Sequence, residues 1–595
     1  SMRKGDSAGT FLIGHPGVTT MWLVGLGMGP ERVDRMATRP GLEDVTRRAG
    51  YLESLVEARR AFVILGAALL AVITLLTWRL AGAGPGTVAG LLLATDPFLA
   101  AHAQLAHLDA TLTAFMAIAV LSAMVFGLRG GSLGYLAVSG VATGLALLTK
   151  APSIILLPAI PLIATLPRLT NLRLFSKHRL QVTAVGLLVW GVLAVAAVVL
   201  LWPAFRVDPL GTLQKLVQFT ARVGGGEHDN FFMGQATDDP GALYYPTMVV
   251  FRLGLGTLSG MLLLTVLRRS PEWRGFIVAS VLFVLGFMLM MNLGPKKFDR
   301  YMLPIFPILG IWAALGWWCL ATRLPVNAPR ATVLVVVAVL LQLVPTLLVR
   351  PYYLSYFNPL LGGGAAAQRQ VLVGWGEDMA PVAAYLNAKP IVIGAPTVAS
   401  SYHRVLQAHL DGSALPIERI DFADYVVPYV NTLQRGLEND ILGLYLQSQA
   451  PELSVWHNGI EYARVYRGPH YPVTLPVGAA LSGSTLVESV IAPGALIARP
   501  GDSVDVLLRW RAASAAAPVA VRLQASDGRA IASVNRRLGE DGQGGNRGGA
   551  EDQVADLHTL EIPRNAPPGT YALSVAYGDA EAGLAELRVE AQVGR

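Results

Sequence analysis

The chain has 595 residues, of which 53% are hydrophobic and only 15% are charged, against about 25% charged residues in an average soluble domain. This composition excludes a wholly soluble protein and indicates an integral membrane protein with a soluble part attached. The formal net charge is +7, yet no dense Lys/Arg tract with interleaved aromatic residues occurs, which argues against nucleic acid as a partner. Cys319 is the single cysteine, so an intramolecular disulfide is excluded.

The N-terminal segment SMRKGDSAGTF is too polar for the apolar core of a signal peptide. From Ala61 to Val349, apolar runs that are long enough to cross the ~30 Å core of a bilayer, or nearly so, recur along the chain. The pattern therefore predicts a polytopic helical membrane part with about ten spans. The runs occupy residues 61–79, 86–104, 110–128, 133–149, 151–167, 181–203, 245–267, 275–293, 302–320 and 331–349.

Basic loops predict the orientation of these spans. The connections 168–179, 268–274 and 321–330 carry arginines or lysines and fall on one side, which the positive-inside rule makes cytoplasmic. The loops 204–244 and 294–304, and everything after residue 350, then lie outside. Two arginines at positions 59 and 60 would also lie outside, against the rule, and an additional upstream span would resolve this conflict.

The composition changes after Tyr352, where short alternating runs replace the long apolar ones. Segments such as IVIGAP and DYVVPYV, mixed with helical patterns, predict an α/β domain. Further on, VDVLLRW, VAVRLQA, HTLEI and YALSVAY alternate with Pro/Gly turns and predict a β-sandwich, in which the Gly-rich segment 539–552 forms a loop. The expected domains are a membrane part (1–350), an α/β domain (351–472) and a β-sandwich (473–595), the last two being extracytoplasmic.

Ionisable residues gather on the predicted outer side of the membrane, at the ends of several spans. They lie between the second and third spans, after the fourth span, in the loop 204–244 and in the segment GPKKFDRYMLP (294–304). Ionisable residues at membrane depth are costly and usually line a functional site. Lysine and arginine can hold a phosphate there, and carboxylates can orient these cations, so the pattern favours a lipid-linked phosphate as ligand.

Structural interpretations of the same residues remain open. Lys150, Lys297 and Arg300 could be helix-end cations that extend toward the interface. Asp109 could cap the helix that follows it, and Asp96 with its following proline could be a turn.

The histidines and tyrosines of this region also have alternatives. His102 and His107 are five residues apart, which is not the i,i+4 spacing expected of a metal pair on a helix. Tyr244 and Tyr245 are typical of the aromatic belt of a membrane protein.

A set of motifs, in this order, resembles the protein mannosyltransferase/aminoarabinose transferase group of glycosyltransferases, which have the GT-C fold. The motifs are HPGVTTMW (15–22), AHLDA (106–110), LTKAP (148–152), HDNFF (228–232), YYP (244–246) and KFDRYMLPIFP (297–307). The segments PYYLSYFNPLLGG and VGWGEDMAPVAAYLN are similar to a subset with an added extracytoplasmic domain. The resemblance covers residues 5–470, while the β-rich tail lies outside it.

The resemblance implies that a sugar is transferred from a polyprenyl-phosphate donor to an extracytoplasmic acceptor, which is a protein, a glycan or a lipid. It also implies an integral protein of a bacterial plasma membrane, with no required cofactor and with a divalent metal as an open possibility. Asp109 resembles the acidic residue that orients a phosphate-binding group. The expected donor-phosphate ligands are His15, Lys150, Lys297, Arg300 and Tyr301. The expected residues of the loop that closes over the substrate are His228, Asp229, Tyr244 and Tyr245.

The residue expected to act as general base is missing from the sequence. In the family this carboxylate belongs to an acidic pair after a first span, upstream of GDSAGTF, and Asp6 is a weak substitute for it. The sequence is therefore interpreted as a shortened version of a longer enzyme. The alternative is a catalytically inactive membrane protein of the same fold that binds a lipid phosphate or a glycan. A transporter would require two related halves, which the sequence does not show.

Overall fold

A computed structural model describes residue 10 and residues 15–36, 46, 49–130, 132–169, 177–226, 228–267, 271–323, 328–390, 393–437, 440–511, 518–537 and 553–591. The chain divides into two compact units. The first comprises residues up to Trp375 together with the returning segments 434–436 and 457–460. The second comprises residues 376–433, 437–456 and 461–595.

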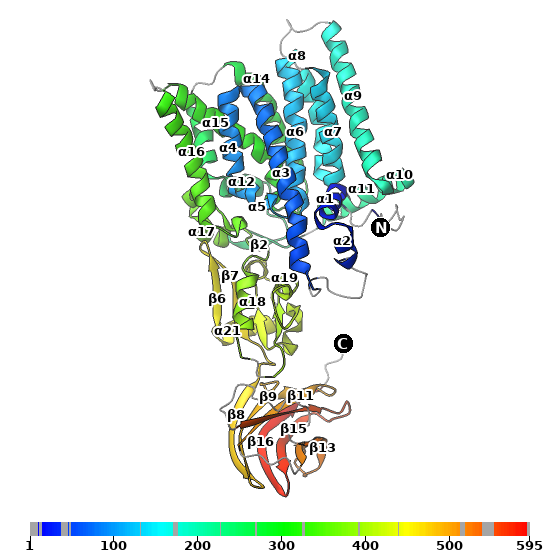
Figure 1. The fold of residues 1–595 in the computed structure, drawn as a ribbon, viewed down its shortest axis with the longest axis vertical. Coiled ribbons are helices and arrows are strands. Elements are labelled where there is room, and N and C mark those ends of the chain that lie inside the picture. Colours follow the sequence, from blue (N-terminus) through cyan, green and yellow to red (C-terminus); the bar gives the residue numbers. More distant parts are fainter. Residues whose placement is uncertain are drawn as a thin grey trace. The chain divides into compact units, whose positions relative to one another are not determined.

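The first unit is helical (Figure 1). Its first helices are α1 (Val18–Met28), α2 (Pro30–Met36), α3 (Tyr51–Ala81), α4 (Ala83–Ala94), α5 (Pro97–Ala103), α6 (Leu108–Arg129), α7 (Leu133–Thr149), η4 (Ala151–Ile155), α8 (Leu156–Leu169), α9 (Lys177–Leu201), α10 (Pro203–Val207) and α11 (Pro209–Gly225). After a hairpin of β1 (Asn230–Phe232) and β2 (Gln235–Thr237) come α12 (Tyr244–Arg252), α13 (Leu255–Val266), η6 (Pro271–Trp273), α14 (Arg274–Asn292), η7 (Asp299–Ile305), α15 (Phe306–Arg323), α16 (Ala328–Leu348), η8 (Tyr353–Ser355), η9 (Pro359–Leu361) and α17 (Gly363–Gln370).

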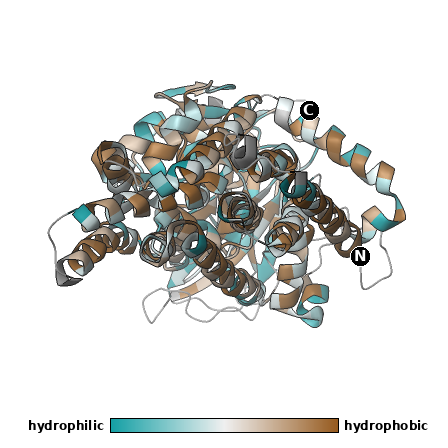
Figure 2. Ribbon diagram, turned by 90° about the horizontal axis from the view of Figure 1, so that it is seen from above, coloured by the Kyte–Doolittle hydropathy of each residue, from teal (hydrophilic) through white to brown (hydrophobic). Residues whose placement is uncertain are grey.

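Among the described residues, six helical segments are long and apolar enough to cross a membrane, or seven if the bent pair α12–α13 counts as one span. Figure 2, seen from above, shows that much of the helical ribbon has the colour of hydrophobic residues. The segments that contain α6 and α15 are mostly buried inside the unit, whereas α3, α9 and α16 leave most of their apolar surface open. Such large apolar surfaces suit contact with lipid, and the predicted class of integral membrane protein is confirmed.

The predicted apolar runs are all helical, but several are interrupted. The run 86–104 is split because Asp96 leaves helical geometry and its side chain accepts hydrogen bonds from the amides of Phe98 and Leu99, so that α5 begins anew at Pro97. The run 245–267 bends by 113° between α12 and α13. Four further apolar helical segments have only 10–17 residues. Hydropathy alone therefore locates the helical runs but not their breaks.

The second unit begins with a five-stranded mixed sheet in the order β4-β3-β5-β7-β6. Its strands are β3 (Thr397–Ser400), β4 (Ser413–Pro416), β5 (Tyr425–Val427), β6 (Leu453–His457) and β7 (Ile460–Arg467). Its helices are α18 (Met379–Asn387), α19 (His403–Gln407), η10 (Ile417–Phe422), α20 (Val430–Gln434) and α21 (Asp440–Ser448). Strand β3 pairs in parallel with β4 and β5, whereas β7 is antiparallel to β5.

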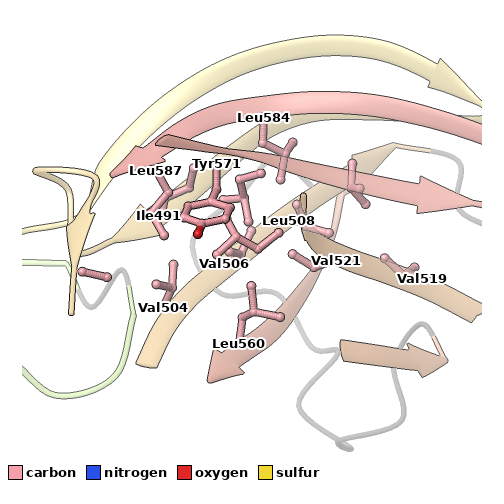
Figure 3. Close-up of a cluster of buried hydrophobic side chains, with 14 of the residues drawn as sticks. Ile491, Val504, Val506, Leu508, Val519, Val521, Leu560, Tyr571, Leu584 and Leu587 are labelled. Carbon is pink, nitrogen blue, oxygen red and sulfur yellow. The ribbon is translucent and has the colours of Figure 1, made fainter. Parts of the chain in front are cut away.

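Two further sheets form the C-terminal part of this unit, in the orders β10-β16-β15-β12-β13 and β14-β11-β9-β8. Alternate residues of the facing strands, such as Val506, Leu508 and Tyr571, form one buried apolar cluster (Figure 3). This period-two burial is what the sequence alternation predicts. The strands are β8 (Val473–Leu481), β9 (Ser484–Ala492), β10 (Ile497–Ala498), β11 (Ser503–Arg511), β12 (Pro518–Gln524), β13 (Ala530–Arg537), β14 (Gln553–Glu561), β15 (Gly569–Tyr577) and β16 (Ala580–Val589).

The predicted succession of a helical membrane part, an α/β sheet and a β-sandwich is confirmed. Three features predicted from the sequence lie outside the described residues, wholly or in large part: Asp6, most of the basic loop 168–179 and the Gly-rich segment 539–552.

Candidate anion-binding site

A buried carboxylate with two cations and a histidine around it forms the centre of the candidate site. Asp109 is 2% exposed, and its Oδ1 accepts a hydrogen bond of 2.6 Å from Lys150 Nζ. Its Oδ2 lies 3.1 Å from His107 Nδ1 and 3.6 Å from Arg300 Nε. Three sequence motifs that are far apart in the chain therefore meet at one carboxyl group.

Local structure explains why these side chains converge. The N-cap residue of α6 is His107 rather than Asp109, so Asp109 lies in the first turn. Lys150 follows the last residue of α7 in an extended conformation, and a 3-10 helix containing Pro152 begins directly after it. This change of direction leaves Lys150 at the junction of two helices, where it is only 4% exposed. Arg300 belongs to a second 3-10 helix, η7.

Aromatic rings surround the cations of the cluster. Lys150 Nζ lies 4.4 Å from the ring centre of Tyr301. The Arg300 guanidinium lies 4.1 Å from the ring centre of Phe298 and 4.9 Å from that of Trp375. Such cation–π contacts hold a cation in place without neutralising its charge.

A separate ion pair anchors η7. Arg252 Nη2 lies 2.6 Å from Asp299 Oδ2, and Arg252 Nη1 donates hydrogen bonds to the carbonyls of Leu354 and Tyr356. The side chain of Arg252 is almost fully buried, and the pair is electrically neutral. Arg252 therefore neutralises the charge of Asp299, and the neighbouring Arg300 interacts with Asp109 instead.

Lys297, a predicted phosphate ligand, is engaged elsewhere. It is 1% exposed, its Nζ donates to Asp239 Oδ1 over 2.6 Å, and its carbonyl accepts a hydrogen bond from Asn230 Nδ2. These contacts attach the β1–β2 hairpin and its following residues to the segment before η7. The hydrogen bond from Lys297 is the main cause that lowers the pKa of Asp239.

The start of α1 brings His15 near Lys150. Gly17 N donates to the carbonyl of Thr149, and the hydroxyls of Thr19 and Thr149 lie 2.7 Å apart. Burial, followed by the positive charge of Lys150, lowers the pKa of His15 to about 4. His15 is therefore neutral near pH 7, so it can offer a hydrogen bond but no positive charge.

The residues of the predicted substrate loop are dispersed. The His228 ring packs against Phe298 at a centroid distance of 5.1 Å, and burial lowers its pKa, whereas Asp229 is exposed. Tyr244 and Tyr245 are buried at the start of α12 and contact each other. By contrast, four of the predicted residues are in direct contact with one another: Asp109, Lys150, Arg300 and Tyr301.

An apolar cavity of about 160 Å³ borders the same end of α6. It is lined by residues of α3, α4, α5 and α6, including Ala110 and Thr111 immediately after Asp109, and by Pro307. Among the described residues, no group of three or more His, Cys, Asp or Glu side chains gathers as a metal site.

Two residues of the site were missed by sequence reasoning. Arg252 ends an apolar helix, and Trp375 lies in the segment VGWGED, which was assigned to the α/β domain. The signal available for Trp375 was its position between two glycines, Gly374 and Gly376, in a segment already noted for its likeness to a family subset.

The fold and this cluster define an integral membrane protein with a buried, positively charged site. A family model described as dolichyl-phosphate-mannose-protein mannosyltransferase matches residues 52–202, from α3 to the end of α9, which is less than half of the chain. The match includes Asp109 and Lys150 and supports the resemblance noted in the sequence.

Solved structures that are similar to the chain include two of ArnT from Cupriavidus metallidurans. The apo structure shares 17% identity with a TM-score of 0.39, over 76% of this chain and 87% of that chain. The structure bound to undecaprenyl phosphate shares 16% identity with a TM-score of 0.38, over 75% of this chain and 87% of that chain. No curated protein matches the chain.

Proposed function

We propose that this protein is a membrane glycosyltransferase that transfers a sugar from a polyprenyl-phosphate donor to an acceptor on the extracytoplasmic side. The observation that carries the proposal is the convergence of Lys150 and Arg300 on the single carboxylate of Asp109. Two cations share one negative charge, so the cluster has a net positive charge in a largely buried position. A phosphate is the ligand class that such a cluster suits.

Arg300 has hydrogen-bonding capacity to spare for an anion. In the described part of the chain its Nε is buried and makes no hydrogen bond, because the Asp109 oxygen at 3.6 Å is beyond hydrogen-bond distance. A buried donor without an acceptor costs about 1–3 kcal/mol. A phosphate oxygen at this position would remove that cost.

The apolar cavity beside α6 supports a lipid as the carrier of this phosphate. Its lining is formed almost entirely by aliphatic, alanine and phenylalanine side chains, and it begins at the residues that follow Asp109. An isoprenoid chain could therefore lie in the cavity while its phosphate reaches the cations. The family model supports a sugar as the transferred group, because its description names a lipid-phosphate mannose.

In the proposed reaction the bond between the anomeric carbon and the phosphate oxygen breaks, and a bond from the acceptor oxygen to that carbon forms. The acceptor proton passes to a base, and the phosphate leaves with the bonding electrons as polyprenyl phosphate. Lys150 and Arg300 stabilise the charge that develops on the leaving phosphate, so the proposal needs no metal. Asp109 positions both cations and is itself a poor base, because it is already paired.

A second candidate function is binding of the lipid phosphate without transfer. It is favoured by the pairing of two carboxylates, the buried Asp109 with Lys150 and the partly buried Asp299 of the neighbouring ion pair with Arg252. General base catalysis needs a carboxylate whose lone pair is available to the acceptor. Each of these two aspartates is held by a cation, which makes it a weak base.

The test uses the full chain in lipid nanodiscs with radiolabelled undecaprenyl phosphates that carry mannose, glucose or arabinose. Transfer to a cell-envelope acceptor fraction is measured beside binding of undecaprenyl phosphate and of undecaprenol. Loss of a charge-assisted contact in Arg300→Ala should weaken binding of the phosphate about 10- to 100-fold and leave undecaprenol unaffected.

Arg222→Ala is the matched control, because Arg222 is exposed near the end of α11. Transfer that depends on Arg300 and not on Arg222 supports the enzyme. Phosphate-dependent binding without transfer supports the binding protein. Equal affinity for undecaprenyl phosphate and undecaprenol would overturn both.

A further inference from the structure

One large aromatic side chain of the cluster is open to solvent. Trp375 is 38% exposed, whereas Asp109 and Lys150 are almost fully buried. Its ring lies 4.9 Å from the Arg300 guanidinium and meets His107 edge-on at 5.1 Å. An apolar surface is therefore available directly beside the cations proposed to hold the phosphate.

The backbone around Trp375 is specified by glycine. Gly374 has φ 89° and Gly376 has φ 97°, a region that residues with a Cβ rarely adopt. Just upstream, Val371 forms a bridge with Phe232, and Val373 N donates to Gln434 Oε1 over 2.9 Å. The position of the indole is thus fixed by a turn and by two anchors, which is the rigidity that a recognition surface requires.

Two other aromatic rings of the cluster also contact its charged side chains. Tyr301 faces Lys150, and Phe298 lies between Arg300 and His228. Trp375 combines contact with Arg300 and an exposed surface, and tryptophan offers the largest aromatic area of any side chain.

We propose that Trp375 is a specificity-determining residue: its exposed indole surface packs against the sugar ring of the donor while Arg300 holds the phosphate. This inference rests on the proposed function. The anomeric carbon is bonded to a phosphate oxygen, so a phosphate at Arg300 brings the sugar ring within reach of an indole whose centre is 4.9 Å from that guanidinium. A sugar ring has a face of C–H groups, and burial of this face on an aromatic surface is favourable.

The test compares two ligands on the full chain in nanodiscs: undecaprenyl phosphate, and the same lipid carrying the sugar that the wild-type protein binds best among mannose, glucose and arabinose. Trp375→Ala should weaken binding of the sugar-bearing lipid about 10-fold relative to binding of the bare lipid phosphate. Trp375→Phe should have an affinity ratio between those of the wild type and Trp375→Ala. Arg300→Ala should weaken both ligands. Trp456→Ala is the matched control, since this exposed tryptophan lies on β6.

Equal weakening of both ligands by Trp375→Ala would mean that the indole only supports Arg300, and would overturn the inference. So would unchanged binding of both ligands in Trp375→Ala, or a wild-type protein that binds both lipids equally. If the wild-type protein does not prefer undecaprenyl phosphate to undecaprenol, the proposed function itself has failed, which is a separate result.

Discussion

Lys297 Nζ lies 2.6 Å from Asp239 Oδ1, and the lysine is buried whereas the aspartate side chain is 55% exposed. A cation that motif reasoning assigned to the donor phosphate thus holds the segment after the β1–β2 hairpin. Because Asp239 is accessible to solvent, the pair can be separated without unfolding the helices.

The first prediction concerns this pair. Asp239→Asn should increase amide hydrogen exchange in residues 230–237, because the buried lysine loses its counter-charge. In the wild type the pKa of Asp239 is lowered, mainly by the Lys297 hydrogen bond. The stability that the ionised Asp239 contributes is therefore present above the unfolded pKa of about 3.9, and it is lost as the pH falls through the folded pKa. Hydrogen exchange that is equal in variant and wild type near pH 7 would contradict the prediction.

The second prediction is a double-mutant cycle at the centre of the cluster. Asp109→Asn should destabilise the helical unit by about 3–5 kcal/mol, because Lys150 is left buried with its partner neutralised. Asp109→Asn combined with Lys150→Met should be less destabilising than the sum of the two single changes. Thermal unfolding in one detergent measures all four proteins. Strict additivity would show that the two side chains are not coupled.

The third prediction concerns pH and the second unit. His470 Nδ1 lies 2.9 Å from Asp424 Oδ1, and this hydrogen bond raises the pKa of His470. The stabilisation is fully present below the unfolded pKa of about 6.5 and is lost as the pH rises through the folded value. Amide exchange of residues 425–427 in the intact chain should accelerate over that range and be flatter in His470→Gln. An identical pH profile in both proteins would refute this.

The fourth prediction concerns the core of the sandwich. Leu508 is fully buried in the cluster of Figure 3, so Leu508→Ala should destabilise this part by about 2–5 kcal/mol. Ile497→Ala is the matched control, since Ile497 is exposed on a strand of the opposite sheet and should cost little. Urea unfolding followed by hydrogen exchange of β11 measures both. A similar decrease in the free energy of unfolding in both variants would show that burial of the side chain does not determine the loss of stability.

Sequence patterns predicted the helical runs because hydrophobicity over a bilayer's thickness leaves a strong signal. They offered the break at Asp96 only as one alternative, a turn at Asp96 and its following proline, since a single proline is compatible with a kink, a turn or a new helix. The β-sandwich was recognisable from alternation, which reports burial of one face.

The site was predictable only in part. Asp109, Lys150 and Arg300 were predicted as site residues because charge at membrane depth is unusual, and the structure brings them together. Trp375 carries no such signal, and its contacts with Arg300 and His107 join residues that are distant in the chain. The partner of Lys297 was equally hidden, because any of several loop carboxylates was compatible with the sequence.

The return of residues 434–436 and 457–460 to the first unit has a practical consequence for dissecting the protein. His457 reaches the carbonyl of Val349, and Asn458 donates to that of Ser355, so the helical unit is completed by chain that arrives more than a hundred residues later. A truncation at residue 350 would remove these contacts along with Trp375. A deletion that starts after Pro472 would spare every one of them, and it is the cut with which a minimal expression variant should begin.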